Sequence, residues 1–323
     1  MASALSNPIF HNEEAAYAHV EARIWPEGPF CPHCGATDRI SAIAANPAKR
    51  VRMGLKKCGH CKKQFTVKVG TVFEQSHVPL NIWLQAIALL TSSKKGFSTN
   101  QLSRVLGVTI KTAWFMSMRI REAMAADGSE PLGGLGKVLE IDETFLGHQP
   151  TVFVSGKGWR TSRGSSELRK IVTIVEREGR ARSIKVDNLR KAEMKRALES
   201  ASRDSMLMTD QSTVYKPLGW QFEGHETVDH GAKEYVRGEV HTNTVEGTFS
   251  IFKRGMRGIY QHCAEKHLHR YLAEFDFRYS NRIKLGVDDA ARAEIALKGI
   301  VGKRLTYRTV GRRKPGAEAR VVW

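Results

Sequence analysis

The chain has 323 residues, of which 51 are Lys or Arg and 33 are Asp or Glu, giving a formal net charge of +18 at pH 7. Because 41% of the residues are hydrophobic, the chain has enough apolar side chains to build cores for roughly two or three domains, which excludes a wholly disordered basic protein. No apolar run is long enough to span a bilayer, so the charge predicts a nucleic-acid partner and no membrane insertion.

The N-terminal segment has no basic stretch followed by an apolar one, so no secretion signal is recognised and a cytoplasmic location is expected. Five cysteines in a reducing compartment indicate metal ligands or buried thiols rather than a disulfide framework.

Four of the cysteines form two C-x-x-C pairs, Cys31 with Cys34 and Cys58 with Cys61. Each pair lets two thiolates reach one ion, and two pairs complete a tetrahedral Zn²⁺ site. With short strands between and after the pairs, the spacing predicts a structural zinc ribbon over residues 25–72. The alternative is two unrelated pairs of reduced cysteines.

A helix is predicted from Leu80, because the apolar residues that follow recur on one helical face. Residues 98–114 then contain a short helix, a glycine turn at Gly107 and a capping Thr109 that opens a second helix. This layout is typical of a helix-turn-helix, whose second helix would present Lys111 and Thr112 to the DNA major groove. A plain helical hairpin that packs two domains together is the alternative.

The glycine-rich residues 127–136 indicate a domain boundary. Beyond it the chain predicts strands at residues 138–146, 170–176, 181–186 and 205–210, a helix over residues 189–200, and a mobile loop over residues 156–170. This order of elements implies a mixed α/β sheet.

Asp142 lies within the first of these strands and Asp210 at the end of the last, both among apolar residues. Residues from about Asn243 onward read as a helix on which Asn243, Glu246, Ser250 and Lys253 form a polar stripe. Two strand aspartates and one helix glutamate are able to hold a pair of Mg²⁺ ions for phosphodiester chemistry.

Each of these residues also has a structural interpretation. Asp142 would pair with a buried arginine, Asp210 would cap the turn at Gln211 and Ser212, and Glu246 with Lys253 would be surface charge. Glu140 and Glu143 flank Asp142 and are lesser candidates, one of them expected to be a solvated side chain.

Four segments carry a resemblance to a known family, in addition to the cysteine pairs and the helix-turn-helix. They are residues 139–147, 207–215, 241–260 and 266–282. With them the chain resembles bacterial insertion-sequence transposases of the DDE class that have an N-terminal zinc ribbon, from about residue 14 to residue 283.

The resemblance implies a multi-domain α/β protein with a ribonuclease-H-like catalytic domain, in which Asp142 and Asp210 are the catalytic aspartates and Glu246 the glutamate. Asn243 competes with Glu246 for the third position, and Glu246 is favoured because a carboxylate binds Mg²⁺, or Mn²⁺ in its place, better than an amide. Lys253 would contact phosphate near the scissile bond. Arg254 and Arg257, beside permissive glycines, are expected to approach DNA phosphates, unless they belong only to a solvated loop.

The expected division is a zinc ribbon over residues 1–75, a helix-turn-helix region over 76–130, the catalytic domain over 131–285 and a basic C-terminal tail over 286–323. The expected function is cutting of the inverted-repeat ends of an insertion sequence and transfer of the 3′-OH ends to target DNA. Because two ends must be held together, a homodimer or larger assembly on DNA is expected. A zinc-ribbon transcription regulator without catalysis and a nuclease without strand transfer are the alternatives.

Overall fold

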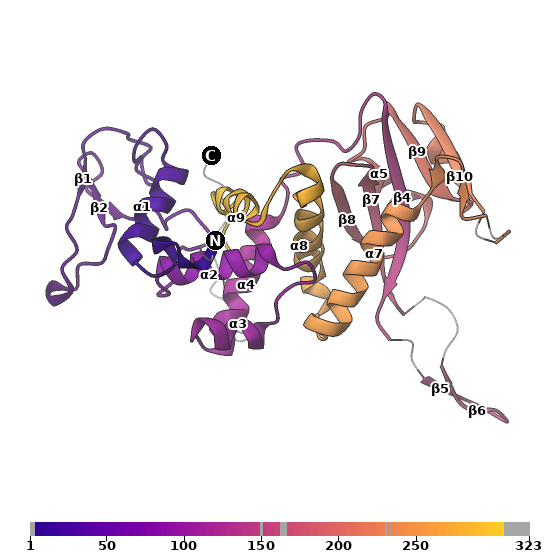
Figure 1. The fold of residues 1–323 in the computed structure, drawn as a ribbon, viewed down its shortest axis with the longest axis horizontal. Helices are drawn as coiled ribbons and strands as arrows, with labels where there is room; N and C mark the ends of the chain where they lie inside the picture. The colour runs from indigo at the N-terminus through magenta and orange to yellow at the C-terminus, as the bar shows by residue number, and fades with distance from the viewer. Residues whose placement is uncertain (1–3, 149–150, 162–166, 230, 233, 307–323) are drawn as a thin grey trace, which may run out of the picture.

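The computed structural model describes residues 4–148, 151–161, 167–229, 231–232 and 234–306. The described chain is elongated, with a small cysteine-rich sheet at one end, a bundle of helices in the middle and a larger sheet at the other end (Figure 1). Within these residues, no helix combines the length and the apolar character needed to cross a membrane.

The N-terminal region holds helix α1 (Glu13–Ile24) and a three-stranded antiparallel sheet. Its strands are β1 (Ile40–Ala42), β2 (Lys56–Cys58) and β3 (Gln64–Phe65), in that order across the sheet. Asn12 begins α1 by accepting a hydrogen bond from the backbone N–H of Ala15 at 3.0 Å. The short strands and the two cysteine pairs agree with the zinc ribbon predicted over residues 25–72.

The middle region is built from α2 (Leu80–Ser92), α3 (Thr99–Leu106) and α4 (Ile110–Met124). Gly107 ends α3 with a φ of +65°, and the Thr109 side chain caps α4 by accepting from the N–H of Thr112. The predicted order of a helix, a glycine turn and a second, capped helix is therefore present. Only the first turn of α4 is exposed, since most of the helix from Met116 onward is buried.

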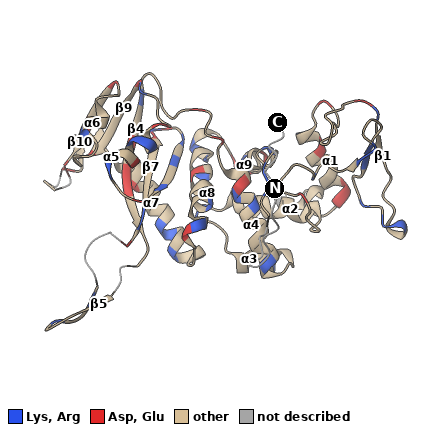
Figure 2. Ribbon diagram, turned by 180° about the vertical axis from the view of Figure 1, so that it is seen from behind, with Lys and Arg blue, Asp and Glu red and all other residues tan. Residues whose placement is uncertain are grey.

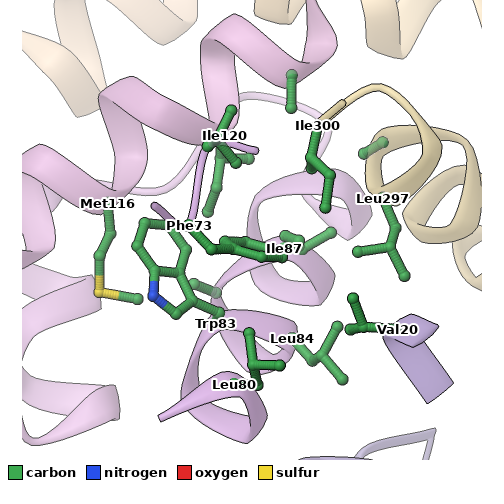
Figure 3. Close-up of a cluster of buried hydrophobic side chains, with 14 of the residues drawn as sticks. Val20, Phe73, Leu80, Trp83, Leu84, Ile87, Met116, Ile120, Leu297 and Ile300 are labelled. Carbon is green, nitrogen blue, oxygen red and sulfur yellow. The ribbon is translucent and has the colours of Figure 1, made fainter. Parts of the chain in front are cut away.

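One hydrophobic core joins the ribbon to these helices. Figure 3 shows Trp83 and Ile87 of α2 in one cluster with Met116 and Ile120 of α4, and with Leu297 and Ile300 from the C-terminal part. These last two residues flank the end of α9 (Asp289–Lys298), which packs against α2. The prediction that residues 286–323 form a tail is thus wrong for α9, because Ala296, Leu297 and Ile300 bury their side chains in this core. Residues 307–323 lie outside the described residues.

The larger sheet has the strand order β10-β9-β4-β7-β8. Its strands are β4 (Lys137–Leu146), β7 (Arg169–Glu176), β8 (Ala181–Val186), β9 (Ser205–Asp210) and β10 (Gly224–Val228). Strands β4, β7 and β8 are antiparallel neighbours, whereas β9 runs parallel to both β4 and β10. The mixed sheet expected for a ribonuclease-H-like domain is confirmed.

Helices cover both faces of this sheet. On one face α5 (Lys191–Leu198) and α6 (Lys216–Gly219) pack on Leu139, Ile141 and Val172. On the other face lie α7 (Asn243–Gly255) and α8 (Leu268–Ser280). A short strand pair, β11 (Val236–Arg237) with β12 (Val240–His241), leads into α7.

Between β4 and β7 the chain forms a projecting hairpin of β5 (Thr151–Val154) and β6 (Gly158–Thr161) (Figure 1). The prediction of a loop over residues 156–170 is wrong for β6 and for the start of β7. Alternation of Val, Phe, Trp and Thr side chains supports strand pairing here, and Gly156 and Gly158 adopt the positive φ angles that the turn between the strands requires. Residues 162–166 lie outside the described residues.

Candidate active site and metal centres

The two aspartates lie on adjacent parallel strands. Strands β4 and β9 pair from Lys137 with Ser205 to Glu140 with Met208, and the same register places Asp142 opposite Asp210. Side chains alternate along a strand, so Asp142 points to the face that carries Glu140 and α7, away from the core formed by Leu139 and Ile141. The pair lies just beyond the last backbone pairing of β4 with β9, where the sheet opens.

The carboxylates of Asp142, Glu143 and Asp210 each offer an oxygen, and these oxygens lie within 4.8 Å of one another. All three side chains are half-buried. Glu143 accepts a hydrogen bond from the buried Tyr215 hydroxyl at 2.6 Å. The expectation that one of Glu140 and Glu143 is a solvated side chain is wrong, because Glu143 is held in this cluster and Glu140 is fully buried.

Burial raises the pKa of Asp142 to about 7, an effect strengthened by the negative charges of Glu143, Asp210 and Glu246 and opposed by a hydrogen bond from the N–H of Glu143. Burial also raises the pKa of Glu143. Among the described residues, Asp142 has no arginine or lysine partner, so the buried-arginine interpretation does not hold. A cluster of crowded carboxylates without a cationic side chain is the donor set that a divalent cation requires.

Asp210 accepts a hydrogen bond from the N–H of Ser212 at 3.0 Å, so it also caps the turn, as the structural interpretation predicted. The preceding Thr209 hydroxyl donates to the carbonyl of Asp210 at 2.7 Å and lies 2.9 Å from Nε2 of His225. These bonds fix the end of β9. The cap uses one carboxylate oxygen of Asp210, so the second oxygen can still bind a metal ion.

Glu140 anchors the start of α7. Its Oε2 accepts from the N–H groups of Thr244 at 2.8 Å and Val245 at 3.0 Å, and its Oε1 accepts from the Thr244 hydroxyl at 2.7 Å. Thr242, at the helix N-cap position, makes no side-chain cap of its own. A carboxylate two residues before Asp142 therefore replaces the local cap and sets the position of α7 on β4.

The charge of Glu140 is balanced by Arg177, whose Nε donates to Oε1 at 2.6 Å. Arg177 also donates to the carbonyls of Glu239 at 2.8 Å and His241 at 2.9 Å. This network joins the turn after β7 to the segment that enters α7. This network was not predicted from the sequence, because the bonded residues are far apart in the chain. In the sequence alone, Glu140 looks the same as a catalytic carboxylate, and only its hydrogen-bond partners show that it anchors α7.

Asn243 and Glu246 are both exposed on the first turns of α7. Glu246 lies outside the three-carboxylate cluster, yet its charge acts on Asp142, and the Thr242 hydroxyl donates to its Oε1 at 3.3 Å. Lys253, two turns further along the same helix, is half-buried. The structure therefore brings Asp142 and Asp210 together and leaves Glu246 outside their cluster, on α7, where its charge still acts on Asp142.

The predicted DNA-binding residues lie at two places. Lys111 and Thr112 are on the first turn of α4, where the Thr112 hydroxyl lies 2.9 Å from that of Thr109. Arg254 and Arg257 are exposed at the C-terminal end of α7 and just beyond it, with Arg254 folded back onto Ser250. Figure 2 shows Lys and Arg at this end of α7, toward the same side of the molecule as α3.

The four cysteine sulfurs also form a compact cluster. All lie within 4.8 Å of one another, with Cys31 to Cys61 at 3.6 Å and Cys34 to Cys58 at 3.7 Å. A Zn²⁺ ion with four Zn–S bonds of about 2.3 Å has S···S edges of about 3.8 Å, which matches these distances. Hydrogen bonds led by the N–H of Cys61 lower the pKa of Cys58 to about 6, whereas the pKa of Cys34 rises to about 11, because the lowering effect of the N–H of Ala36 is outweighed by desolvation and by hydrogen bonds with the other three sulfurs.

Two family models match the chain. The transposase zinc-ribbon domain matches residues 11–64 and the ISXO2-like transposase domain matches residues 132–280, the range that contains Asp142, Asp210 and α7. The chain thus combines a transposase zinc-ribbon domain with a transposase domain. It is therefore a DNA transposase of the DDE class with an N-terminal zinc ribbon that binds a structural Zn²⁺, as the resemblance implied.

The transposase is also similar to an uncharacterized protein in transposable element ISH50 of Halobacterium salinarum. The two are 28% identical over 280 residues, which cover 82% of this chain and 90% of the relative. Because that organism is an archaeon, similar proteins are not restricted to bacteria.

Two solved structures are weakly similar. The Mos1 strand transfer complex has 10% identity and a TM-score of 0.25, covering 67% of this chain and 74% of that one. The Mos1 transposase paired-end complex with left transposon end has 12% identity and a TM-score of 0.18, covering 63% and 77%. Neither score is high enough to compare the site residues of these proteins with those of this chain.

Proposed function

We propose that this transposase binds the ends of its own insertion sequence, cuts them to expose 3′ hydroxyls and joins those hydroxyls to target DNA. Asp142, Asp210 and Glu246 would hold two divalent cations, Mg²⁺ in the cell and Mn²⁺ as a substitute. The observation that carries the proposal is the in-register pair of aspartates facing α7, with the pKa of Asp142 raised to about 7 and no cationic side chain paired with it among the described residues.

The donors at this site are carboxylate oxygens, which are the ligands that Mg²⁺ and Mn²⁺ prefer. When bound, such ions supply the charge that activates an attacking oxygen and stabilises a leaving oxygen on phosphorus. Asp142 and Asp210 must both be ionised to bind them. Lys253, half-buried further along α7, is assigned to a non-bridging phosphate oxygen next to the scissile bond.

In the cutting step, the oxygen of water bonds to phosphorus and the bond from phosphorus to the 3′ oxygen breaks, leaving a 3′ hydroxyl. In the joining step, that hydroxyl bonds to a phosphorus of target DNA, loses its proton and displaces a target 3′ oxygen. Both are substitutions at phosphorus, so one set of carboxylates serves both and no covalent bond to the protein is needed. A nuclease would stop after the cutting step, and a regulator would perform neither step. The match to a transposase domain favours both cutting and joining.

Glu246 is the proposed third carboxylate. Glu143 lies closer to the aspartates, but one of its oxygens accepts a hydrogen bond from the Tyr215 hydroxyl. Because side chains alternate along β4, Glu143 also points to the sheet face that carries Ile141, opposite the face that carries α7. Asn243, the competitor on the first turn of α7, brings an amide rather than a charge. Glu246 directly follows the two backbone N–H groups, of Thr244 and Val245, that Glu140 anchors, and its charge acts on Asp142.

The ribbon of residues 1–75 and the helix-turn-helix of residues 76–130 are proposed to recognise the element ends, with Lys111 and Thr112 at base edges and Arg254 and Arg257 at phosphates. Residues 131–285 form the proposed catalytic domain. Two ends must be cut in concert, so the working form is proposed to be at least a homodimer on DNA.

Cleavage of labelled element-end DNA tests the assignment. Glu246→Gln is expected to lower the cleavage rate more than about a hundredfold, because even outer-shell partners of metal ligands are worth about 10- to 100-fold. Glu143→Gln is the matched control, and its cleavage rate should fall by no more than about 10- to 100-fold, as should the rate of Asn243→Ala. A larger loss in Asn243→Ala than in Glu246→Gln would move the third position to Asn243.

A further inference from the structure

A groove separates the helix-turn-helix region from the catalytic domain. It has a volume of about 860 Å³ and lies between α4, the end of β4 and the segment that follows α7. The side chains that matter for its chemistry are Trp114, His148, Arg169, Arg257, His262 and His267. It is distinct from the carboxylate cluster, because none of the residues that line it belongs to that cluster.

The groove is cationic. Two arginines and three histidines line it, and no acidic residue does so among the described residues. Arg169 is fixed by donating to the carbonyl of Cys263 at 2.7 Å, whereas Arg257 is exposed to solvent. An exposed arginine of this kind, beside histidine N–H groups, is suited to phosphate oxygens.

Helix α7 connects the active site to this groove. At 100° per residue, Glu246, Ser250 and Lys253 fall within about 60° of one another on α7, so they form one stripe. Arg257 follows in the π-helical segment Met256–Tyr260, which continues α7 and extends the stripe toward the groove. The rise from Glu246 to Arg257 is about 16 Å at 1.5 Å per residue. At about 3.4 Å per nucleotide along one DNA strand, this is a span of about five nucleotides.

The groove has rigid walls. Arg121 of α4 donates to Glu274 of α8 at 2.6 Å with both side chains buried, and Arg278 and Tyr260 bond the same carboxylate. Burial alone would raise the pKa of Glu274, but Arg278 and Arg121 hold it at about 2, so the carboxylate stays charged. Arg270 pairs with Glu122 beside this network. The recognition helix and the catalytic domain are therefore fixed relative to each other across the groove.

We propose that this groove holds the phosphodiester backbone of the element-end duplex about five nucleotides from the scissile phosphate, on its path from the active site to the helix-turn-helix. The inference rests on the proposed function and adds the path that the DNA takes. A basic peptide is a poor occupant: residues 307–323 include five Arg or Lys and one Glu, so this segment would be repelled. An acidic peptide would fit the charge, and the tests separate it from DNA.

The first test is the salt dependence of end binding without divalent cations, so that chemistry plays no part. Arg257→Ala is expected to make the slope of log affinity against log salt concentration less steep by about 0.9. The loss of DNA affinity between 50 and 200 mM salt should therefore be about 3.5-fold smaller than in the wild-type protein. Arg196→Ala is the matched control, since Arg196 is 58% exposed on α5, which covers the opposite sheet face. An unchanged slope in Arg257→Ala would overturn the proposal, as would an equal change in Arg196→Ala.

The second test uses Cys263, which lines the groove and is the one cysteine outside the predicted zinc site. DNA carrying a disulfide-activated tether on single phosphates is expected to exchange with the Cys263 thiol, releasing the small thiol of the tether, most efficiently about five nucleotides from the cut, and not with Cys263→Ser. No crosslink at any position, or a maximum at the scissile phosphate, contradicts the proposal. If the wild-type protein crosslinks at this position but does not cleave the DNA in Mg²⁺, the catalytic assignment is refuted and the proposal for the groove stands.

Discussion

Glu140 provides the most demanding prediction, because the structure gives it a structural task next to the catalytic aspartate. Its carboxylate is fully buried and accepts bonds from Arg177, Thr244 and Val245. Glu140→Ala leaves a largely buried guanidinium without its partner, which costs about 3–5 kcal/mol. It also removes the cap of α7, worth about 1 kcal/mol by itself, although the two losses overlap. The free energy of unfolding is therefore expected to fall by about 3–5 kcal/mol.

Urea denaturation followed by circular dichroism measures this change. Glu178→Ala is the control, because Glu178 pairs with Lys284 at 3.1 Å on the surface, with side chains 78% and 68% exposed, and its loss should cost less than about 1 kcal/mol. Arg177→Met combined with Glu140→Met should recover part of the loss, since no unpaired charge remains. A loss below about 1 kcal/mol in Glu140→Ala, no larger than that of a surface pair, would refute the anchoring role.

The same anchor predicts an effect on catalysis. Glu140→Gln keeps the size of the side chain but places an amide against Arg177, so α7 should shift relative to β4. Well below its melting temperature, this variant is expected to cleave about 10- to 100-fold more slowly and to need more Mg²⁺ for half-maximal rate. Unchanged cleavage at unchanged Mg²⁺ demand would show that α7 is positioned by other contacts.

Two further predictions concern stability. Purified protein is expected to contain one Zn²⁺ per chain by atomic absorption, and its removal by a chelator should unfold the ribbon and lower the melting temperature; a zinc-free protein of unchanged melting temperature would contradict this. Burial raises the pKa of Asp276 to about 6, despite hydrogen bonds from the N–H and hydroxyl of Ser183. The folded protein thus keeps a proton that the unfolded chain releases, so the free energy of unfolding should fall by about 3 kcal/mol as pH rises from about 3 to 7. Asp276→Asn should flatten that part of the stability profile, and a profile identical to wild type would refute the assignment.

Much of this architecture follows from local sequence patterns. Some features act over only a few residues, so they were predicted from the sequence. They are the helix cap at Thr109, the turn at Gly107 and the apolar strands that carry Asp142 and Asp210. The placement of both aspartates at one site also followed, because they end or lie within strands of the same sheet.

The remaining features depend on contacts between distant parts of the chain. α9 joins the N-terminal core through Leu297 and Ile300, which no local pattern reveals. Glu140 and Asp142 are alternate acidic residues on one strand, and only their partners distinguish an anchor from a metal ligand. Glu143 reaches the cluster through the hydroxyl of Tyr215, far along the chain.

The central claim is that Asp142 and its neighbours perform both cutting and joining. Purified protein, labelled element-end DNA and a plasmid target in Mg²⁺ test it directly, beside Asp142→Asn, which keeps the shape of the side chain but not its charge. We expect joined products with the wild-type protein and none with the variant, while both bind the ends equally well. Joined products from Asp142→Asn at the wild-type rate would contradict this claim, and cleaved ends without joining by the wild-type protein would reduce the activity to that of a nuclease.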